Sequence, residues 1–195
     1  MEIIRGNVVD LIDSFNQEPD LIVTDPPYAL TGAGAEHGIT ASVAVGLRES
    51  AKKLKRGSWA IVFSASSWRS TAYMIEALRG VLEPVRISSW VKPKVRTRVS
   101  TVGWQWATVN VIAFRKGPKN RVDLPPPMAS LDWIEAEPVM NGRRAELPPS
   151  VCQWAVAPFA IPGGLVLDPF CGSGALLTAA ERIGMSGVGF EMQGK

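Results

Sequence analysis

The amino-acid sequence predicts an α/β fold in which a doubly wound, mixed but mostly parallel sheet carries helices on both faces. Short apolar runs typical of buried strands alternate along the chain with segments whose apolar residues recur at helical spacing. The chain has 195 residues, of which 46% are hydrophobic and 20% are charged. This size and composition are those of an ordinary globular protein, so we expect a single domain over residues 1–195.

The expected elements follow one another from end to end. Apolar, β-rich runs predict strands at Ile3–Ile4, Leu21–Thr24, Ser58–Phe63, Val85–Val91, Thr108–Phe114, Leu165–Asp168 and Gly187–Glu191. Apolar residues three or four positions apart predict helices at about Val8–Phe15, Ile39–Leu54, Trp68–Leu78, Val151–Ala157 and Ala175–Ile183. Ser66 or Ser67 is placed to cap the third helix, whose apolar face is expected to include Trp68, Ala72, Ile75 and Leu78. The Pro-rich residues 117–147 show little periodicity and are expected to be irregular.

Several classes of protein are disfavoured. Residues 147–167 carry no charge, but prolines and glycines interrupt them, so a continuous membrane-spanning helix is not expected. The first ten residues lack the basic and apolar regions of a secretory signal, and we expect a cytoplasmic protein with no membrane partner. Cys152, Cys171 and the single His37 cannot complete a metal site at ligand spacing. We therefore expect no metal, two small buried thiols and a solvated histidine in a Gly-rich loop.

Basic residues are concentrated in the middle of the sequence. Nine of them and no acid lie between Pro84 and Val122, although the formal net charge of the chain is only +3. Trp90, Trp104 and Trp106 are interleaved with them, as in segments that bind a phosphate backbone. A solvated basic loop between two core strands remains the alternative. Within residues 92–107, an extended chain would place four basic side chains on one side: Lys92, Lys94, Arg96 and Arg98.

Two motifs follow predicted strands. The first is "DPPY", Asp25 to Tyr28, at the end of an apolar run. The second is "DPFCGSG", Asp168 to Gly174, between a strand and a helix, where glycines allow a ligand to approach the backbone. Glu191 lies roughly 20 residues further on, at the end of the next strand, where an acid can accept hydrogen bonds from a ribose. This combination predicts a cofactor that contains a nucleoside.

The second motif differs from a dinucleotide-binding turn. It lacks the Gly-x-Gly-x-x-Gly pattern, and Asp168 would repel a pyrophosphate. An acid at this place suits a cofactor that presents a positive group. A nicotinamide-dependent oxidoreductase is disfavoured for the same reason, and because no His or Lys able to handle a hydride lies beside the turn.

Taken together, the two motifs resemble those of the S-adenosylmethionine-dependent DNA amino-methyltransferases of the N6-adenine and N4-cytosine type. The order, with "DPPY" first and "DPFCGSG" last, is similar to the permuted group called the beta class. "GNVVDL" at Gly6 to Leu11 and "SWVKP" at Ser89 to Pro93 look like further segments of that family. The resemblance covers most of the chain and implies a Rossmann-like, circularly permuted methyltransferase fold.

The resemblance also implies roles for individual residues. Asp25 and a carbonyl of Pro26 or Pro27 would accept the amino hydrogens of a base flipped out of the duplex, on which Tyr28 would stack. The cofactor S-adenosyl-L-methionine would be bound by seven residues: Asn7, Asp168, Phe170, Gly172, Ser173, Gly174 and Glu191. Lys92, Lys94, Arg96 and Arg98 would contact double-stranded DNA. Family members are often homodimers, and those with Asp at the first catalytic position mostly methylate adenine N6.

Other interpretations stay open. Cytosine N4 fits the same chemistry. The short, Pro-rich recognition region at residues 117–147 and the missing lysine in "RRAELPPSVCQW" would also suit a degenerate methyltransferase that binds DNA without catalysis. An RNA guanine-N2 methyltransferase is disfavoured, because relatives of that kind place the cofactor motif first.

Overall fold

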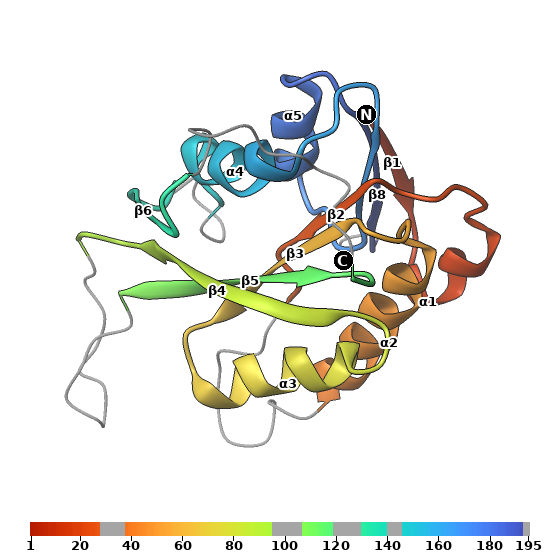
Figure 1. The fold of residues 1–195 in the computed structure, drawn as a ribbon, viewed down its shortest axis with the longest axis horizontal. Coiled ribbons are helices and arrows are strands. Elements are labelled where there is room, and N and C mark those ends of the chain that lie inside the picture. Colours follow the sequence, from red (N-terminus) through yellow and green to blue (C-terminus); the bar gives the residue numbers. More distant parts are fainter. Residues whose placement is uncertain (28–37, 95–106, 119–129, 140–145, 193–195) are drawn as a thin grey trace.

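A computed structural model describes residues 1–27, 38–94, 107–118, 130–139 and 146–192 of the chain. Eight strands form one sheet in the order β1-β8-β7-β2-β3-β5-β4-β6 (Figure 1). Their bounds are β1 Glu2–Arg5, β2 Leu21–Thr24, β3 Trp59–Ala65, β4 Glu83–Val91, β5 Thr108–Arg115, β6 Trp133–Glu135, β7 Leu165–Asp168 and β8 Ser186–Glu191. Neighbouring strands are parallel except where β5 lies antiparallel between β3 and β4. The predicted mixed, mostly parallel sheet is confirmed.

Helices cover both faces of this sheet. They are α1 Val8–Leu11, α2 Gly38–Lys53, α3 Trp68–Leu78, α4 Pro149–Val156 and α5 Ala175–Glu181, with short 3₁₀ turns at Ile12–Ser14 and Ala157–Phe159. Helices α4 and α5 lie on one face, and α1, α2 and α3 lie on the other, as Figure 1 shows. Successive strand residues therefore alternate between two apolar clusters, with Ile61 in one and Val62 in the other. A strand enclosed on both faces explains the unbroken apolar runs.

Most elements lie within a few residues of their predicted bounds, and three details differ. The first helix tightens into a 3₁₀ turn after Leu11. Trp68 and Ala72, both expected on the apolar face of α3, are exposed, Trp68 to 85%, because Trp68 begins the helix directly after the cap Ser67 and the buried face is formed by Thr71, Met74 and Leu78. Strand β6 lies within the region expected to be irregular, since three residues are too few to show alternation in sequence.

The two cysteines are buried and free, as expected. Within the described ranges, no helix is long and apolar enough to cross a bilayer.

The basic residues that the structure describes in this segment lie towards opposite ends of β4. Arg86 and Arg115 pair with Asp132 and Glu83 through N–O distances of 3.2 and 3.0 Å, towards the amino end of β4. Lys92 and Lys94 lie at the other end of the same strand. The chain turns at Pro93 and Lys94, so the extended conformation considered for this segment is not adopted at these two residues. Proline removes a backbone donor, which ends the ladder there.

Core packing predicts a large contrast between two aromatic residues. Phe114→Ala removes a fully buried ring from the cluster beneath α2 and α3, and it should lower the free energy of unfolding by about 3–5 kcal/mol. Trp68→Ala, at a well-exposed position, should change that free energy by no more than about 0.5 kcal/mol. Urea denaturation of both variants measures the difference. Equal losses would contradict the described packing.

Candidate functional site

Residues from distant parts of the sequence meet at one edge of the sheet. Strands β1, β8, β7, β2 and β3 run parallel, so their carboxyl ends lie together. Asp25 follows β2, Asp168 ends β7, Glu191 ends β8, and Asn7 follows β1 by two residues. Strands β2 and β7 are neighbours at the centre of the sheet, and the helices after them lie on opposite faces. Such a switch point is where open α/β sheets bind their ligands.

One oxygen of the Asp25 carboxyl group is enclosed by the protein, although the residue as a whole is partly exposed. Its Oδ1 atom is inaccessible to water and has no hydrogen-bond partner among the described residues. Burial raises the pKa of Asp25 from its ordinary value of 3.8 to about 7, and the positive charge of Lys92 partly opposes that rise. An enclosed acceptor with no protein partner is costly, and it is common where a ligand supplies the donor.

The two prolines fix the backbone after Asp25. Pro26 is buried and Pro27 is exposed, and each proline ring holds its own φ near one value. The backbone that leaves the sheet after Asp25 therefore has few accessible conformations. Tyr28, the last residue of the motif, lies outside the described residues.

A second carboxyl group is buried beside the first. Asp168 is 1% exposed, and its Oδ1 accepts a hydrogen bond of 3.1 Å from the N–H of Phe170. Burial raises its pKa to about 7, while the nearby Thr24 hydroxyl and the Phe170 N–H oppose the rise. The Thr24 hydroxyl makes no well-formed hydrogen bond, so its effect is that of a neighbouring dipole. Negative charge at Asp25 and Glu191 adds to the rise.

Glycines give the turn after Asp168 its shape. Gly172 and Gly174 have φ values of 51° and 83°, in the left-handed region that other residues rarely adopt. The N–H of Gly172 donates a 2.9 Å hydrogen bond to Oε2 of Glu191, and the N–H of Cys171 donates one of 2.9 Å to the Phe190 carbonyl. The turn is therefore held against the end of β8, with Glu191 partly exposed beside it.

The structure places the other predicted cofactor residues near the same edge. The side-chain oxygen of Asn7 accepts a 3.1 Å hydrogen bond from the N–H of Val9 and caps α1. The ring of Phe170 packs towards α2, where a Cβ on Gly46 would lie 3.1 Å from it. Ser173 is exposed in the turn. Asn7 and Phe170 thus have structural contacts that the motifs alone did not reveal.

Two of the four predicted DNA contacts are described, and they differ. Lys94 is 83% exposed and lies 3.7 Å from a carboxylate oxygen of Glu137. Lys92 is half-buried, and its ammonium lies 5.3 Å from the centroid of the Trp90 ring. Arg96 and Arg98 lie outside the described residues. The interaction of Lys92 with Asp25 was not expected from the sequence, where the two residues stand far apart and on strands that are not neighbours.

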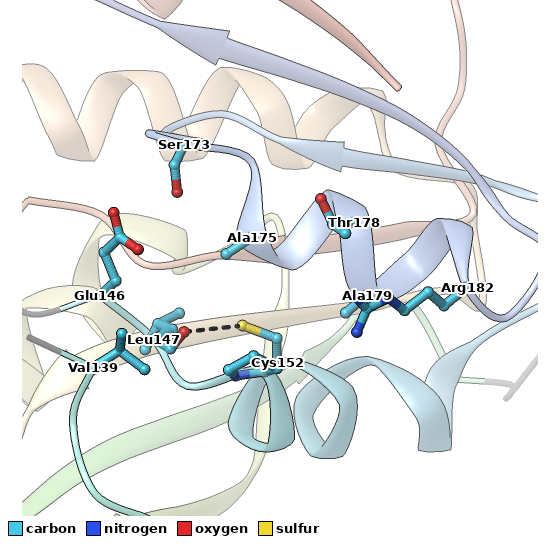
Figure 2. A pocket seen from close by; sticks show the side chains of 10 residues that line it. Val139, Glu146, Leu147, Cys152, Ser173, Ala175, Thr178, Ala179 and Arg182 are labelled. Carbon is cyan, nitrogen blue, oxygen red and sulfur yellow. Dashed lines mark hydrogen bonds between the residues drawn. The ribbon is translucent and has the colours of Figure 1, made fainter. Parts of the chain in front are cut away.

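A pocket of about 370 Å³ borders the glycine turn (Figure 2). Helices α4 and α5 and the pair Val139 and Glu146 form its walls, and Ser173 is the one predicted site residue among the lining residues that the structure describes. Figure 2 shows the side chains of Glu146 and Ser173 on the left of the view, with Arg182 on the right. In the described parts of the chain, no three His, Cys, Asp or Glu side chains are gathered as metal ligands. The polar groups described at this edge include the carboxyl groups of Asp25, Asp168 and Glu191 and the N–H groups of the turn.

Comparisons with known proteins agree with this arrangement. A family model described as DNA methylase, of the N6/N4 type, matches residues 133–195, which include the glycine turn and Glu191 but not Asp25. No curated protein has significant sequence similarity to the chain.

Solved structures match the chain over nearly its whole length. M1.HpyAVI in complex with SAM is 21% identical, with a TM-score of 0.78 over 98% of this chain and 92% of that one. The cytosine-N4-specific PvuII DNA methyltransferase is 20% identical, with a TM-score of 0.75 over 98% and 81%. TTHA0409 from Thermus thermophilus, provisionally described as a DNA modification methylase, is 19% identical in its complex with S-adenosyl-L-methionine, with a TM-score of 0.74 over 97% and 87%. The resemblance found in the two motifs is confirmed: the chain has the fold of the DNA methyltransferases, and its C-terminal third matches the N6/N4 DNA methylase family.

Proposed function

We propose that this protein transfers a methyl group from S-adenosyl-L-methionine to the exocyclic amino group of a DNA base, most favourably adenine N6. One observation carries the proposal: Oδ1 of Asp25 is enclosed and has no hydrogen-bond partner among the described residues. It lies beside the buried Asp168, where the carboxyl ends of the parallel strands meet. The matched family model and the SAM complexes of M1.HpyAVI and TTHA0409 support the cofactor.

The residues at the edge fit that cofactor. Asp168 and the backbone of the turn at Gly172 and Gly174 would hold its methionine end, where a buried acid suits a positive group. Glu191 would accept hydrogen bonds from the ribose hydroxyls, since its carboxylate is partly exposed and is steadied by the Gly172 N–H. When bound, the cofactor supplies an electrophilic methyl group on a sulfonium.

The residues after β2 fit the target base. An exocyclic amino nitrogen is a poor nucleophile because its lone pair is delocalised into the ring. Oδ1 of Asp25 would accept a hydrogen bond from one amino hydrogen, and the carbonyl of Pro26 would accept one from the other. Two acceptors held in place favour a tetrahedral nitrogen, and the negative carboxylate stabilises the positive charge that develops there. A raised pKa also leaves Asp25 able to take up the proton that the methylated amino group must lose.

The choice of base rests on the family resemblance. Asp at the first catalytic position favours adenine N6 over cytosine N4. The similarity to the cytosine-N4-specific PvuII enzyme supports the alternative, in which the same acceptors act on cytosine. DNA is the proposed substrate in both cases, with Lys94 at the carboxyl edge as a phosphate contact.

Transfer of a labelled methyl group tests the proposal. The protein is incubated with methyl-labelled S-adenosyl-L-methionine and unmethylated duplex DNA, and the digested nucleosides are identified by mass spectrometry. N6-methyladenine is the expected product, and Asp25→Asn should reduce its rate by at least about 10²-fold, as for loss of a general base. Cofactor binding by this variant is the control. N4-methylcytosine would overturn the base assignment, and absence of label with wild-type protein that binds DNA would favour a non-catalytic DNA-binding role.

Cofactor affinity gives a second prediction. Glu191→Ala removes the proposed ribose acceptor and the partner of the Gly172 N–H, so the dissociation constant for S-adenosyl-L-methionine should rise about 10–100-fold. Isothermal titration calorimetry measures the change. Glu76→Ala, at an exposed position of α3 outside the candidate site, is the matched control. An unchanged constant for Glu191→Ala would exclude the ribose role.

The raised pKa values predict an unusual dependence of stability on pH. Asp25 and Asp168 keep their protons to higher pH in the folded protein than in the unfolded chain, whose aspartates titrate near 3.8. The folded state therefore binds more protons between about pH 4 and 7, and their contribution to stability falls as the pH rises through that window.

Asp25→Asn should accordingly raise the melting temperature of the cofactor-free protein by a few degrees at pH 8 and leave it nearly unchanged at pH 4. Differential scanning calorimetry at the two pH values measures the effect. A lower melting temperature at pH 8 would show that the charged form of Asp25 stabilises the fold.

A further inference from the structure

Lys92 is held in place where β4 reaches the carboxyl edge. Its N–H donates a 2.7 Å hydrogen bond to the carbonyl of Ala107, which joins the ends of β4 and β5. Its ammonium lies over the ring of Trp90. That ring is itself buried and fixed by a 2.8 Å hydrogen bond from its N–H to the Ala136 carbonyl. The side chain of Lys92 therefore lies along a rigid aromatic surface.

The tryptophan brings the lysine towards the candidate catalytic acid. Trp90, Val23 of β2 and Phe63 of β3 belong to one apolar cluster, on the face of the sheet that α4 and α5 cover. Asp25 follows β2 two residues after Val23. The charges of Lys92 and Asp25 influence each other's pKa: the ammonium of Lys92 lowers the pKa of Asp25, and the carboxylate of Asp25 raises that of Lys92. Figure 1 shows the ends of β2, β3 and β4 on the same side of the sheet.

Lys94, two residues after Lys92, is a surface lysine with which the environment of Lys92 can be compared. It is exposed and lies near Glu137, as expected for a group that could exchange a carboxylate for a phosphate. Lys92 is half-buried, and the described residues place no carboxylate within 4.0 Å of its ammonium. Burial lowers the pKa of Lys92, and the charge of Asp25 opposes that change. The two lysines, two positions apart, are therefore in different environments.

Other groups also face Asp25. Asp168 on β7 adds negative charge, and Cys152 on α4 stays a neutral thiol, since burial raises its pKa to about 12. Among the described residues, Lys92 supplies the positive charge that opposes protonation of Asp25. A protonated carboxyl group would offer a donor where the amino group of the base also offers donors. The proposed reaction therefore needs Asp25 ionised.

We propose that Lys92 is a positioning residue for catalysis, whose ammonium keeps the Asp25 carboxylate ionised to receive the amino group, rather than a contact to a DNA phosphate. The inference rests on the proposed function for its catalytic consequence. The electrostatic pairing itself can be tested in the protein without DNA or cofactor.

Carbon-13 NMR titration of the aspartate carboxyl groups tests the pairing directly. The Asp25 signal is assigned by its loss in Asp25→Asn and followed in wild-type protein, Lys92→Met, Lys92→Arg and Lys94→Met. In Lys92→Met the pKa of Asp25 should rise by about 1 unit, the low end of the effect of a neighbouring opposite charge. It should stay close to the wild-type value in the other two variants. If Lys92→Met does not fold, Lys92→Gln replaces it. An unchanged titration of Asp25 in the folded variant would overturn the proposal, whether or not methyl transfer is observed.

Kinetics and DNA binding separate the two roles of a lysine. In Lys92→Met, the acid limb of the plot of kcat against pH should move to higher pH by about 1 unit, as the pKa of Asp25 does. The salt dependence of DNA affinity should not change. In Lys94→Met the acid limb should stay and the slope of log affinity against log salt should fall by about 0.9. A reduced salt slope in Lys92→Met, with the acid limb unmoved, would make Lys92 a phosphate contact and contradict the inference. If the wild-type protein transfers no methyl group, the proposed function fails, and the NMR titration still decides the pairing.

Discussion

The parallel direction of five strands is the constraint on which the candidate site depends. Because their carboxyl ends share one edge, residues as distant in sequence as Asn7, Asp25, Asp168 and Glu191 are brought to one place. None of them needs a long loop to reach it. Helices on both faces exclude water from the strands below, so the edge is the place where the buried interior and polar groups meet.

Two acids enclosed at this edge work against stability. Asp25 and Asp168 both have raised pKa values because burial disfavours their charged forms. A fold selected for stability alone would replace them with neutral groups of similar size. Their presence, with an Oδ1 that has no partner among the described residues, fits a site completed by a ligand. Glycines at positions 172 and 174 give the adjoining turn a shape that other residues adopt only with strain.

Much of this structure follows from local sequence patterns. Apolar runs located the strands, and the motifs "DPPY" and "DPFCGSG" marked the two strand ends that meet. Patterns of this kind do not show whether other parts of the protein cover the first turn of a helix. The sequence therefore did not predict that Trp68, at the start of α3, is exposed. They also could not reveal that the charge of Lys92 acts on Asp25, because that interaction depends on how β4 and Trp90 pack in three dimensions. A lysine in a basic segment gives no signal that distinguishes it from its neighbours.

The central claim is that the cofactor and the base meet at the carboxyl edge between β7 and β2. A crystal structure with bound S-adenosyl-L-homocysteine tests it most directly, with the Glu191→Ala protein under the same conditions as a control. The account predicts the ribose hydroxyls within hydrogen-bond distance of Glu191, and the sulfur on the side of Asp168 that faces Asp25. A ligand lying wholly between α4 and α5, in the pocket that borders Ser173, would contradict it, as would equal ligand occupancy in the control at a concentration near the wild-type dissociation constant.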